Sequence, residues 1–224
     1  MTKPQPKHAA ILMGDIVASS AHPDPKALQK EFAAGVALMN KEFAAQIRSP
    51  LTITLGDEFQ GVVETLATAF DIAHRMRILF LMQGIECRFV VGAGEISTKV
   101  NAKKAWNMMG PGLAAVRERL NSMDDENAYD FVLAGDPILS EFIEIFAKTM
   151  TEIERNWTKT QLAYMGAYYL KENRSAVNLA KAFKVTGRNV YKVIDAAKLK
   201  LYEEQLKGVT IILRQNDKSN GADK

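Results

Sequence analysis

Apolar residues recur along the chain with spacings that predict helices and strands in turn. They step by three or four positions across residues 25–47, which predicts a helix with one buried stripe. A second helix is predicted over "LATAFDIAHRMRILFLMQ", ending at Gly84. The apolar runs "AAILMGDIVAS" and "ECRFVVGAGEI" predict buried strands, and residues 51–64 predict a hairpin that turns at Gly56.

These elements follow the order strand, helix, strand, strand, helix, strand. That order is typical of a ferredoxin-like βαββαβ sheet. A further helix near residues 112–121, a strand in "FVLAG" and a helix from Asp136 extend the same unit. The fold class predicted for residues 1–150 is therefore α+β.

From Trp157 the pattern becomes purely helical, and "VNLAKAFKVTGRNVYKVIDAAKLKLYEE" fits a helix-turn-helix template. Lys184 stands where the turn usually has glycine, and Gly187 follows slightly later. With Ala180 placed where the two helices cross, every apolar position of the template is filled: Leu179, Phe183, Val185, Val190 and Val193. We therefore expect an all-α helix-turn-helix domain at residues 157–207. A strand or wing and a disordered tail are expected at 208–224.

Charge separates these two parts of the chain. Residues 1–157 carry a net charge of −4, residues 158–207 carry +6, and the remainder carries +1. A basic helical segment predicts DNA as a partner, and the alternative is a helical hairpin that serves dimerisation. Because one helix-turn-helix contacts half of a typical operator, we expect a homodimer. The side chains expected to reach DNA are Lys181, Arg188, Asn189, Tyr191, Lys192 and Lys198.

Cysteine and histidine content limits the metal chemistry. The single cysteine, Cys87, rules out an internal disulfide and fits a reducing cytoplasm. With only three histidines, a Cys/His zinc site is not expected, so any bound metal should be a hard cation held by carboxylates. No apolar run reaches the roughly 18 residues that a membrane helix needs. We therefore expect a cytoplasmic protein that does not interact with membranes.

Two adjacent acids, Asp57 and Glu58, follow Gly56 in the hairpin sequence "LTITLGDEFQG". Acids are common at turns, and a turn alone would account for them. Glu58 should point away from Asp57 and be solvated or paired with Arg88. In a βαββαβ sheet the first strand lies beside the central hairpin, so Asp15 and Asp57 are expected to face one another. Two such carboxylates need a shared cation, a shared proton or a basic partner.

Several motifs, in order along the chain, resemble those of class III nucleotidyl cyclases. "MGDIVASS" is similar to their first-strand metal motif, and "LGDEFQG" is similar to their hairpin motif. "RFVVGAGEI" and "GPGLAAVRERL" resemble a later strand and helix. Over about residues 8–206 the chain resembles the SatD family, which joins a cyclase-like body to a DNA-binding end. The resemblance implies a ferredoxin-like sheet of nucleotidyl cyclase type.

The resemblance also implies roles for the residues at the matching positions. Asp15 and Asp57 match two metal-binding aspartates, which implies Mg²⁺ or Mn²⁺. Arg119 matches an arginine that stabilises the transition state. The position of a partner asparagine holds Ala115, a loss worth on the order of 3 kcal/mol of barrier. The residues expected at the nucleotide phosphates are Ile16, Ser19 and Ser20.

Glu95 is expected to add a ligand contact, because it follows the small residues Gly92, Ala93 and Gly94 near the expected site. A plain carboxylate at the edge of the sheet is the alternative for this residue. The sequence thus predicts a DNA-binding regulator with a cyclase-like metal- and nucleotide-binding sensor domain. The alternatives are a Mg²⁺-dependent nucleotidyl cyclase or transferase, and an interaction scaffold without catalysis.

Overall fold

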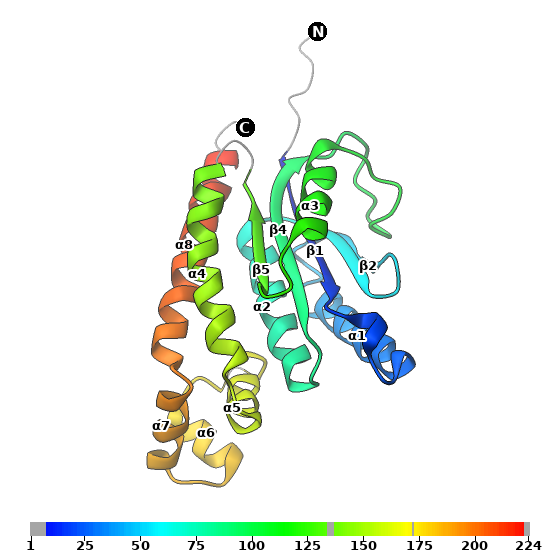
Figure 1. Cartoon of the computed structure of the whole chain (residues 1–224). Coiled ribbons are helices and arrows are strands. Elements are labelled where there is room, and N and C mark those ends of the chain that lie inside the picture. The colour runs from blue at the N-terminus through cyan, green and yellow to red at the C-terminus, as the bar shows by residue number, and fades with distance from the viewer. Residues whose placement is uncertain (1–7, 134–136, 172, 222–224) are drawn as a thin grey trace.

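Five strands form one sheet in the order β2-β3-β1-β4-β5 (Figure 1). The computed structural model describes residues 8–133, 137–171 and 173–221. The strands are β1 (His8–Ile16), β2 (Ile47–Ile53), β3 (Glu58–Val63), β4 (Cys87–Glu95) and β5 (Tyr129–Val132). The helices are the short 3₁₀ helix η1 (Ser19–Ala21), then α1 (Pro25–Glu42), α2 (Leu66–Met82), α3 (Pro111–Ser122), α4 (Pro137–Arg155), α5 (Lys159–Tyr169), α6 (Ala176–Phe183), α7 (Gly187–Ala196) and α8 (Leu199–Gly221). The chain is therefore a mixed α+β protein, as its sequence predicts.

The central strand β1 is antiparallel to both of its neighbours, β3 and β4. β2 is antiparallel to β3, whereas β5 is parallel to β4 and forms an edge. The register places Asp15 opposite Glu58 on one side and opposite Arg88 on the other. The end of β1 therefore brings together charged residues from three neighbouring strands.

Alternation along β1 gives the sheet two apolar faces. Leu12 and Ile16 belong to a large core that includes buried residues of α1 and α2. Ile11 and Met13 point to the opposite face and pack with residues of α3. Because neighbouring side chains of a strand point to opposite faces, Asp15 shares the α3 face with Ile11 and Met13.

The first helix is shorter than the apolar spacing predicts. Asp24 caps its start by accepting a hydrogen bond from the backbone N–H of Ala27 at 2.9 Å. The helix ends at Glu42, and Ile47 begins β2, where it pairs with Val63. The expectation that Ile47 continues the helix is therefore wrong, because its four-residue spacing from Phe43 also suits the first residue of a buried strand.

Each of the helices α5, α6 and α7 begins at a side-chain hydroxyl. Thr158, Ser175 and Thr186 accept hydrogen bonds from backbone N–H groups in the first turn of α5, α6 and α7, respectively. In α5 the side chain of Gln161 also accepts from the backbone N–H of Thr158 at 2.7 Å, which completes a capping box. Local sequence therefore determines where these three helices begin.

Residues 208–215 form neither a wing nor a strand, because they belong to the long helix α8. This helix runs back along α4 toward the sheet (Figure 1). Near its end the Asp217 carboxylate accepts hydrogen bonds from the backbone N–H groups of Leu66 at 2.7 Å and Ala67 at 3.2 Å. Asp217 therefore caps α2, and the expected tail is helical to Gly221, with residues 222–224 outside the described ranges.

A buried polar network joins α8 to the body of the protein. The side chains of Arg77 and Glu154 are each 1% exposed or less, and Arg77 Nε lies 3.0 Å from Glu154 Oε2. The hydroxyls of Tyr129 and Tyr202 donate to Glu154 Oε1 at 2.8 and 2.6 Å. Burial raises the pKa of Glu154, while Arg77 and the two hydroxyls oppose that shift by stabilising the carboxylate. One network therefore connects α2, β5, α4 and α8.

Replacing Tyr202 with Phe should destabilise the protein by about 2 kcal/mol, because a buried hydrogen bond to a charged group is lost. Glu154→Ala should cost about 3–5 kcal/mol, because it removes the partner of a buried arginine. Urea unfolding measures both changes. Tyr168→Phe is the matched control, since the Tyr168 hydroxyl bonds the exposed Glu203 at 2.7 Å. An equal loss in Tyr168→Phe and Tyr202→Phe would contradict the central role of the network.

Candidate functional site

Asp15 is held by an arginine of the neighbouring strand. Arg88 Nε and one terminal nitrogen lie 2.9 and 3.0 Å from the two oxygens of Asp15. Arg88 also donates to Asp125 Oδ1 and to the backbone carbonyl of Met123, both at 2.6 Å. Burial raises the pKa of Asp15, and the bonds from Arg88 oppose that shift. The carboxylate of Asp15 could be accommodated by a shared cation, a shared proton or a basic partner. The structure therefore shows the third of these, with Arg88 as the partner.

Asp57 lies beside the loop that follows β1. Its backbone carbonyl accepts from the N–H of Ile16 at 3.0 Å, and its carboxylate accepts from the hydroxyl of Ser19. Ala18 takes a left-handed backbone conformation with φ 53°, which turns the chain into η1. The loop after β1 and the hairpin tip are thus fastened to one another.

A pocket of about 450 Å³ opens between this loop, the hairpin tip and the start of α1. It is lined by Ile16, Ser19, Ser20, Pro25, Lys26, Leu28, Gln29, Leu55, Gly56 and Asp57. The structure therefore brings Ile16, Ser19, Ser20 and Asp57 to one cavity, and their nucleotide- and metal-binding roles stay predictions. Asp15 is absent from its lining, because alternation turns its side chain to the α3 face.

The two aspartates do not fit a shared divalent cation. Both oxygens of Asp15 accept hydrogen bonds from Arg88, and Asp57 accepts one from Ser19. Within the residues that the structure describes, no group of three or more acidic, histidine or cysteine side chains is arranged to hold a metal. A hard cation needs several oxygen ligands, and this arrangement supplies too few.

A second arginine pair, which sequence reasoning missed, lies beside the first. Glu58 is 8% exposed, and its Oε1 lies 2.5 Å from a terminal nitrogen of Arg117. Arg117 also donates to Gln60 Oε1 at 2.7 Å. The expectation that Glu58 pairs with Arg88 is therefore corrected. The register of β1 and β4 places Arg88 opposite Asp15, and the packing of α3 on this face of the sheet brings Arg117 to Glu58.

Arg119 lies on a different side of α3 from Arg117, because two residues along a helix are separated by about 200°. Its guanidinium contacts Asp130 Oδ2 at 2.6 Å and Glu144 Oε1 at 2.8 Å. Burial, with the nearby Asp130 acid, raises the pKa of Glu144 to about 7. Arg119 therefore links α3 to β5 and α4, and the structure does not bring it to Asp57.

Glu95 lies at the opposite end of the sheet from Asp15. The register pairs Glu95 with His8, seven positions from Asp15 along β1, which corresponds to about 23 Å. The glycines before Glu95 let α3 approach β4 closely, since a Cβ on Gly94 would lie 2.3 Å from the Cα of Gly112 in α3. The expectation that Glu95 lies near the site is therefore wrong.

The residues predicted to reach DNA lie on α6, on α7 and in the turn between α7 and α8. α6 ends at Phe183, and Lys184 adopts the left-handed conformation that glycine usually supplies, with φ 54°. The fully buried Val190 anchors α7. Five of the residues predicted to reach DNA are exposed on α6 and α7: Lys181, Arg188, Asn189, Tyr191 and Lys192.

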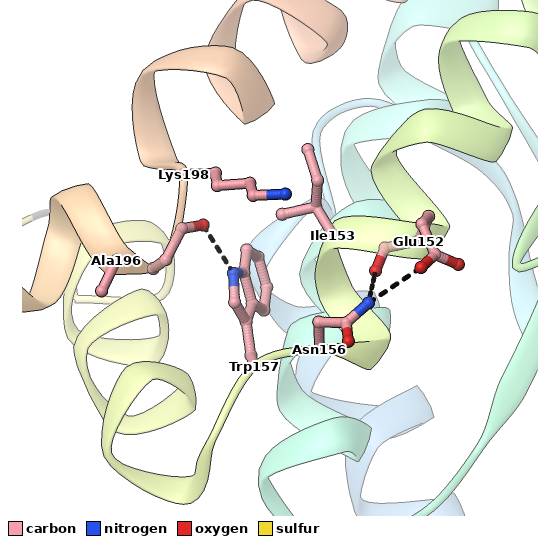
Figure 2. A pocket seen from close by; sticks show the side chains of 7 residues that line it. Glu152, Ile153, Asn156, Trp157, Ala196 and Lys198 are labelled. Carbon is pink, nitrogen blue, oxygen red and sulfur yellow. Dashed lines mark hydrogen bonds between the residues drawn. The ribbon is translucent and has the colours of Figure 1, made fainter.

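Lys198 stands apart from that group, in the turn between α7 and α8. It borders a small cavity of about 70 Å³ that Glu152, Ile153, Asn156 and Trp157 also line (Figure 2). Trp157 Nε1 donates to the backbone carbonyl of Ala197 at 2.9 Å, which fixes this turn against the end of α4. The Lys198 side chain extends toward Ile153 in Figure 2.

A family model matches residues 9–212 and bears the description SatD family. The chain belongs to the SatD family. The match extends from β1 into α8, so it includes the pocket beside Asp57 and both α6 and α7. No curated protein matches this SatD-family chain significantly.

Solved structures of nucleotidyl cyclases resemble this SatD-family protein distantly. The guanylyl cyclase Cya2 gives a TM-score of 0.43 at 10% identity, with 58% of this chain and 77% of that chain covered. A bacterial light-regulated adenylyl cyclase gives 0.42 at 15% identity, covering 58% and 44%. The guanylate cyclase domain of RhGC from Catenaria anguillulae in complex with GTP gives 0.42 at 12% identity, covering 56% and 78%. No helix in the described ranges is long and apolar enough to cross a membrane.

Replacing Arg88 with Met should release the Asp15 carboxylate and create affinity for Mn²⁺. Electron paramagnetic resonance of the metal measures binding directly. We expect no Mn²⁺ bound at Asp15 in the wild type, and at least roughly tenfold tighter binding in Arg88→Met, because the Asp15 and Asp125 carboxylates and the Met123 carbonyl that Arg88 now occupies would together become available as oxygen ligands. Arg48→Met, on an exposed arginine of β2, is the control. Wild-type Mn²⁺ binding that disappears in Asp57→Asn would contradict this interpretation.

Proposed function

We propose that this SatD-family protein is a DNA-binding regulator whose helices α6 and α7 form a helix-turn-helix. The observation that carries the proposal is the first two turns of α7, which present the exposed Arg188, Asn189 and Lys192 while Val190 is buried. Thr186 accepts from the backbone N–H of Asn189, so the Asn189 side chain is available to a base edge. A recognition helix reads the major groove with residues of this kind.

The packing of the three helices supports a recognition role for α7. The ring of Phe183 in α6 stacks on Tyr164 of α5 with centroids 4.0 Å apart. The template residues of α6 and α7 pack on the same core, with Leu179 and Val190 buried. α5 therefore acts as the support for the pair, and α7 lies at the end of the molecule away from the sheet (Figure 1).

Electrostatics favour a polyanion as the partner of this end. Residues 158–207 carry a net charge of +6, opposite in sign to the body. Within the described ranges, Lys181, Arg188 and Lys192 take part in no ion pair. Basic side chains without acidic partners are available to displace the counterions of phosphates.

We further propose that the pocket beside Asp57 binds a nucleotide that regulates DNA binding. The strand order β2-β3-β1-β4, with α1 and α2 between the strands in sequence, supports a ferredoxin-like fold of the nucleotidyl cyclase type. Ser20 and Lys26 supply a hydroxyl and a cation for phosphate oxygens, whereas the Ser19 hydroxyl donates to Asp57. Because Asp15 is paired with Arg88, and Arg119 with Asp130 and Glu144, the arrangement supports binding rather than cyclase catalysis.

A chain of contacts joins the pocket to the C-terminal helices. The backbone N–H of Val17 donates to the carbonyl of Glu86 at 2.9 Å, and the Glu86 carboxylate lies 2.5 Å from Arg77. Arg77 contacts Glu154, which holds Tyr202 of α8. A ligand that moves the loop after β1 would therefore act on the buried network that positions α8.

Arg188→Ala and Lys192→Ala should weaken DNA binding and should each reduce the slope of log affinity against log salt by about one. Asn189→Ala should instead relax sequence preference, since a bidentate base contact is worth roughly 1–3 kcal/mol. Fluorescence anisotropy with genomic fragments measures all three variants. Lys41→Ala, on an exposed lysine of α1, is the control. Folded wild-type protein that fails to bind DNA at low salt would overturn the regulator proposal.

Nucleoside triphosphates should raise the melting temperature of the wild type, because binding to the folded state alone stabilises it. Ser20→Glu should remove the shift, since it replaces a hydroxyl donor with a second carboxylate in the pocket that Asp57 already lines. Thr160→Glu, an equal change at an exposed position of α5, should leave it unchanged. A screen in which no nucleotide shifts the melting temperature would contradict the nucleotide proposal and leave the DNA proposal intact.

A further inference from the structure

The outer face of α4 exposes a row of large apolar side chains. Ile138, Phe142 and Ile145 are 79%, 51% and 59% exposed, and their spacing places them on one side of the helix. Ile143 and Ala147, on the other side, are fully buried in the core. α4 is therefore apolar on both sides, although the residues that the structure describes cover only one of them.

The neighbouring helix α8 extends this apolar face. The ring of Phe146 lies against Gly208, where a Cβ would meet it at 3.3 Å. Because the two helices run in opposite directions, Ile211 is at the level of residue 143, beside Phe142. Ile211 is 55% exposed. We define these four residues, Ile138, Phe142, Ile145 and Ile211, as the α4–α8 face.

We propose that the α4–α8 face binds a second copy of this chain, with the two-fold axis parallel to both helices. This axis places α4 of each copy over the partner's α8 at the same height. An interface of this kind is self-complementary, as a two-fold dimer requires. Phe142 and Ile145 of each copy then lie close to the height of the partner's Ile211, and Ile138 lies at the height of residue 216.

Charge favours this axis over a perpendicular one. Glu141 lies exposed on the flank of α4, and Lys207, Arg214 and Lys218 lie exposed along α8. Phe146 of α4 and Gly208 of α8 lie at the same height along the two antiparallel helices. Five residues earlier in α4, Glu141 therefore lies at the height of residue 213, five residues later in α8. The parallel axis therefore brings Glu141 to the partner's Arg214, an attractive pair, while the exposed Lys148 lies level with residue 206. A perpendicular two-fold axis in the interface would instead place each α4 over its own copy and each α8 over its own copy, which removes the pair between Glu141 and Arg214.

The same axis suits the DNA-binding proposal. This support for the axis depends on that proposal, whereas the support from the apolar residues, the charges and the area does not. α7 lies beyond the start of α8, at one end of the α4–α8 face (Figure 1). A two-fold axis parallel to the helices keeps both copies of α7 at that end, where one duplex can meet both. A perpendicular axis would place them at opposite ends.

The available area is sufficient for a specific dimer. α4 has 19 residues and α8 has 23, so the helices are about 28 and 34 Å long. With two helix diameters of about 10 Å each, the face measures about 600 Å² per copy, or about 1,200 Å² in total. That area is at the lower end of the range for specific interfaces.

Sedimentation velocity of the DNA-free protein tests the proposal over a concentration series. The wild type should sediment as two chains of 24.8 kDa each. Ile145→Glu should weaken dimerisation by at least roughly a hundredfold, because it would bury an unpaired charge. Leu38→Glu, the same kind of change on the exposed surface of α1, should leave the dimer unchanged. A wild type that remains monomeric at all concentrations would overturn the proposal.

A charge exchange tests the axis itself. Glu141→Arg should weaken the dimer about fivefold by opposing Arg214 of the partner subunit, and adding Arg214→Glu should restore it. Failure of the second change to restore dimerisation would overturn the parallel axis. Circular dichroism verifies that each variant is folded. Because these experiments contain no DNA, a dimer that fails to bind DNA would contradict only the DNA-binding proposal.

Discussion

The buried ion pair between Arg77 and Glu154 is the interaction on which the arrangement of the other elements depends. A charge removed from water must find partners, or it destabilises the fold by several kcal/mol. Arg77 of α2 finds two carboxylates, and Glu154 of α4 finds a guanidinium and two tyrosine hydroxyls. These partners come from α2, the start of β4, β5, α4 and α8. Any large displacement of α8 would leave part of this network unsatisfied.

This constraint bears on how the proposed sensor and DNA-binding functions are connected. α8 cannot tilt freely, because Tyr202 is held at its start and Asp217 caps α2 near its end. α7 is fastened at the α7–α8 turn, where Ala197 accepts from Trp157. One hydrophobic core is continuous from the sheet to Val190 of α7. A ligand-induced change at the pocket would therefore reach α7 through contacts already made.

The same electrostatic requirement explains which groups neutralise Asp15, near the end of β1, and the neighbouring Glu58. A carboxylate at a half-buried position needs a positive partner, and arginine and a divalent cation are competing solutions. In this chain β4 and α3 supply Arg88 and Arg117, which pair with Asp15 and Glu58. The motif that resembles a metal site therefore lies in an environment of guanidinium groups. A motif specifies the acids, while their neighbours determine what neutralises them.

The sequence alone determined the elements that depend on local spacing: α2, the strands β1, β3 and β4, and the paired helices α6 and α7 followed their apolar patterns and caps. It also located the pocket loop, because Ile16, Ser19 and Ser20 follow β1 directly. Only the tertiary structure decided that residues 208–215 form a helix, since an apolar run suits a strand or a helix equally until its packing partner is known. The tertiary structure also paired Asp15 with Arg88, and it placed Glu95 about one strand length away from Asp15. Those outcomes depend on strand register and on contacts between residues far apart in the chain, which local spacing does not encode.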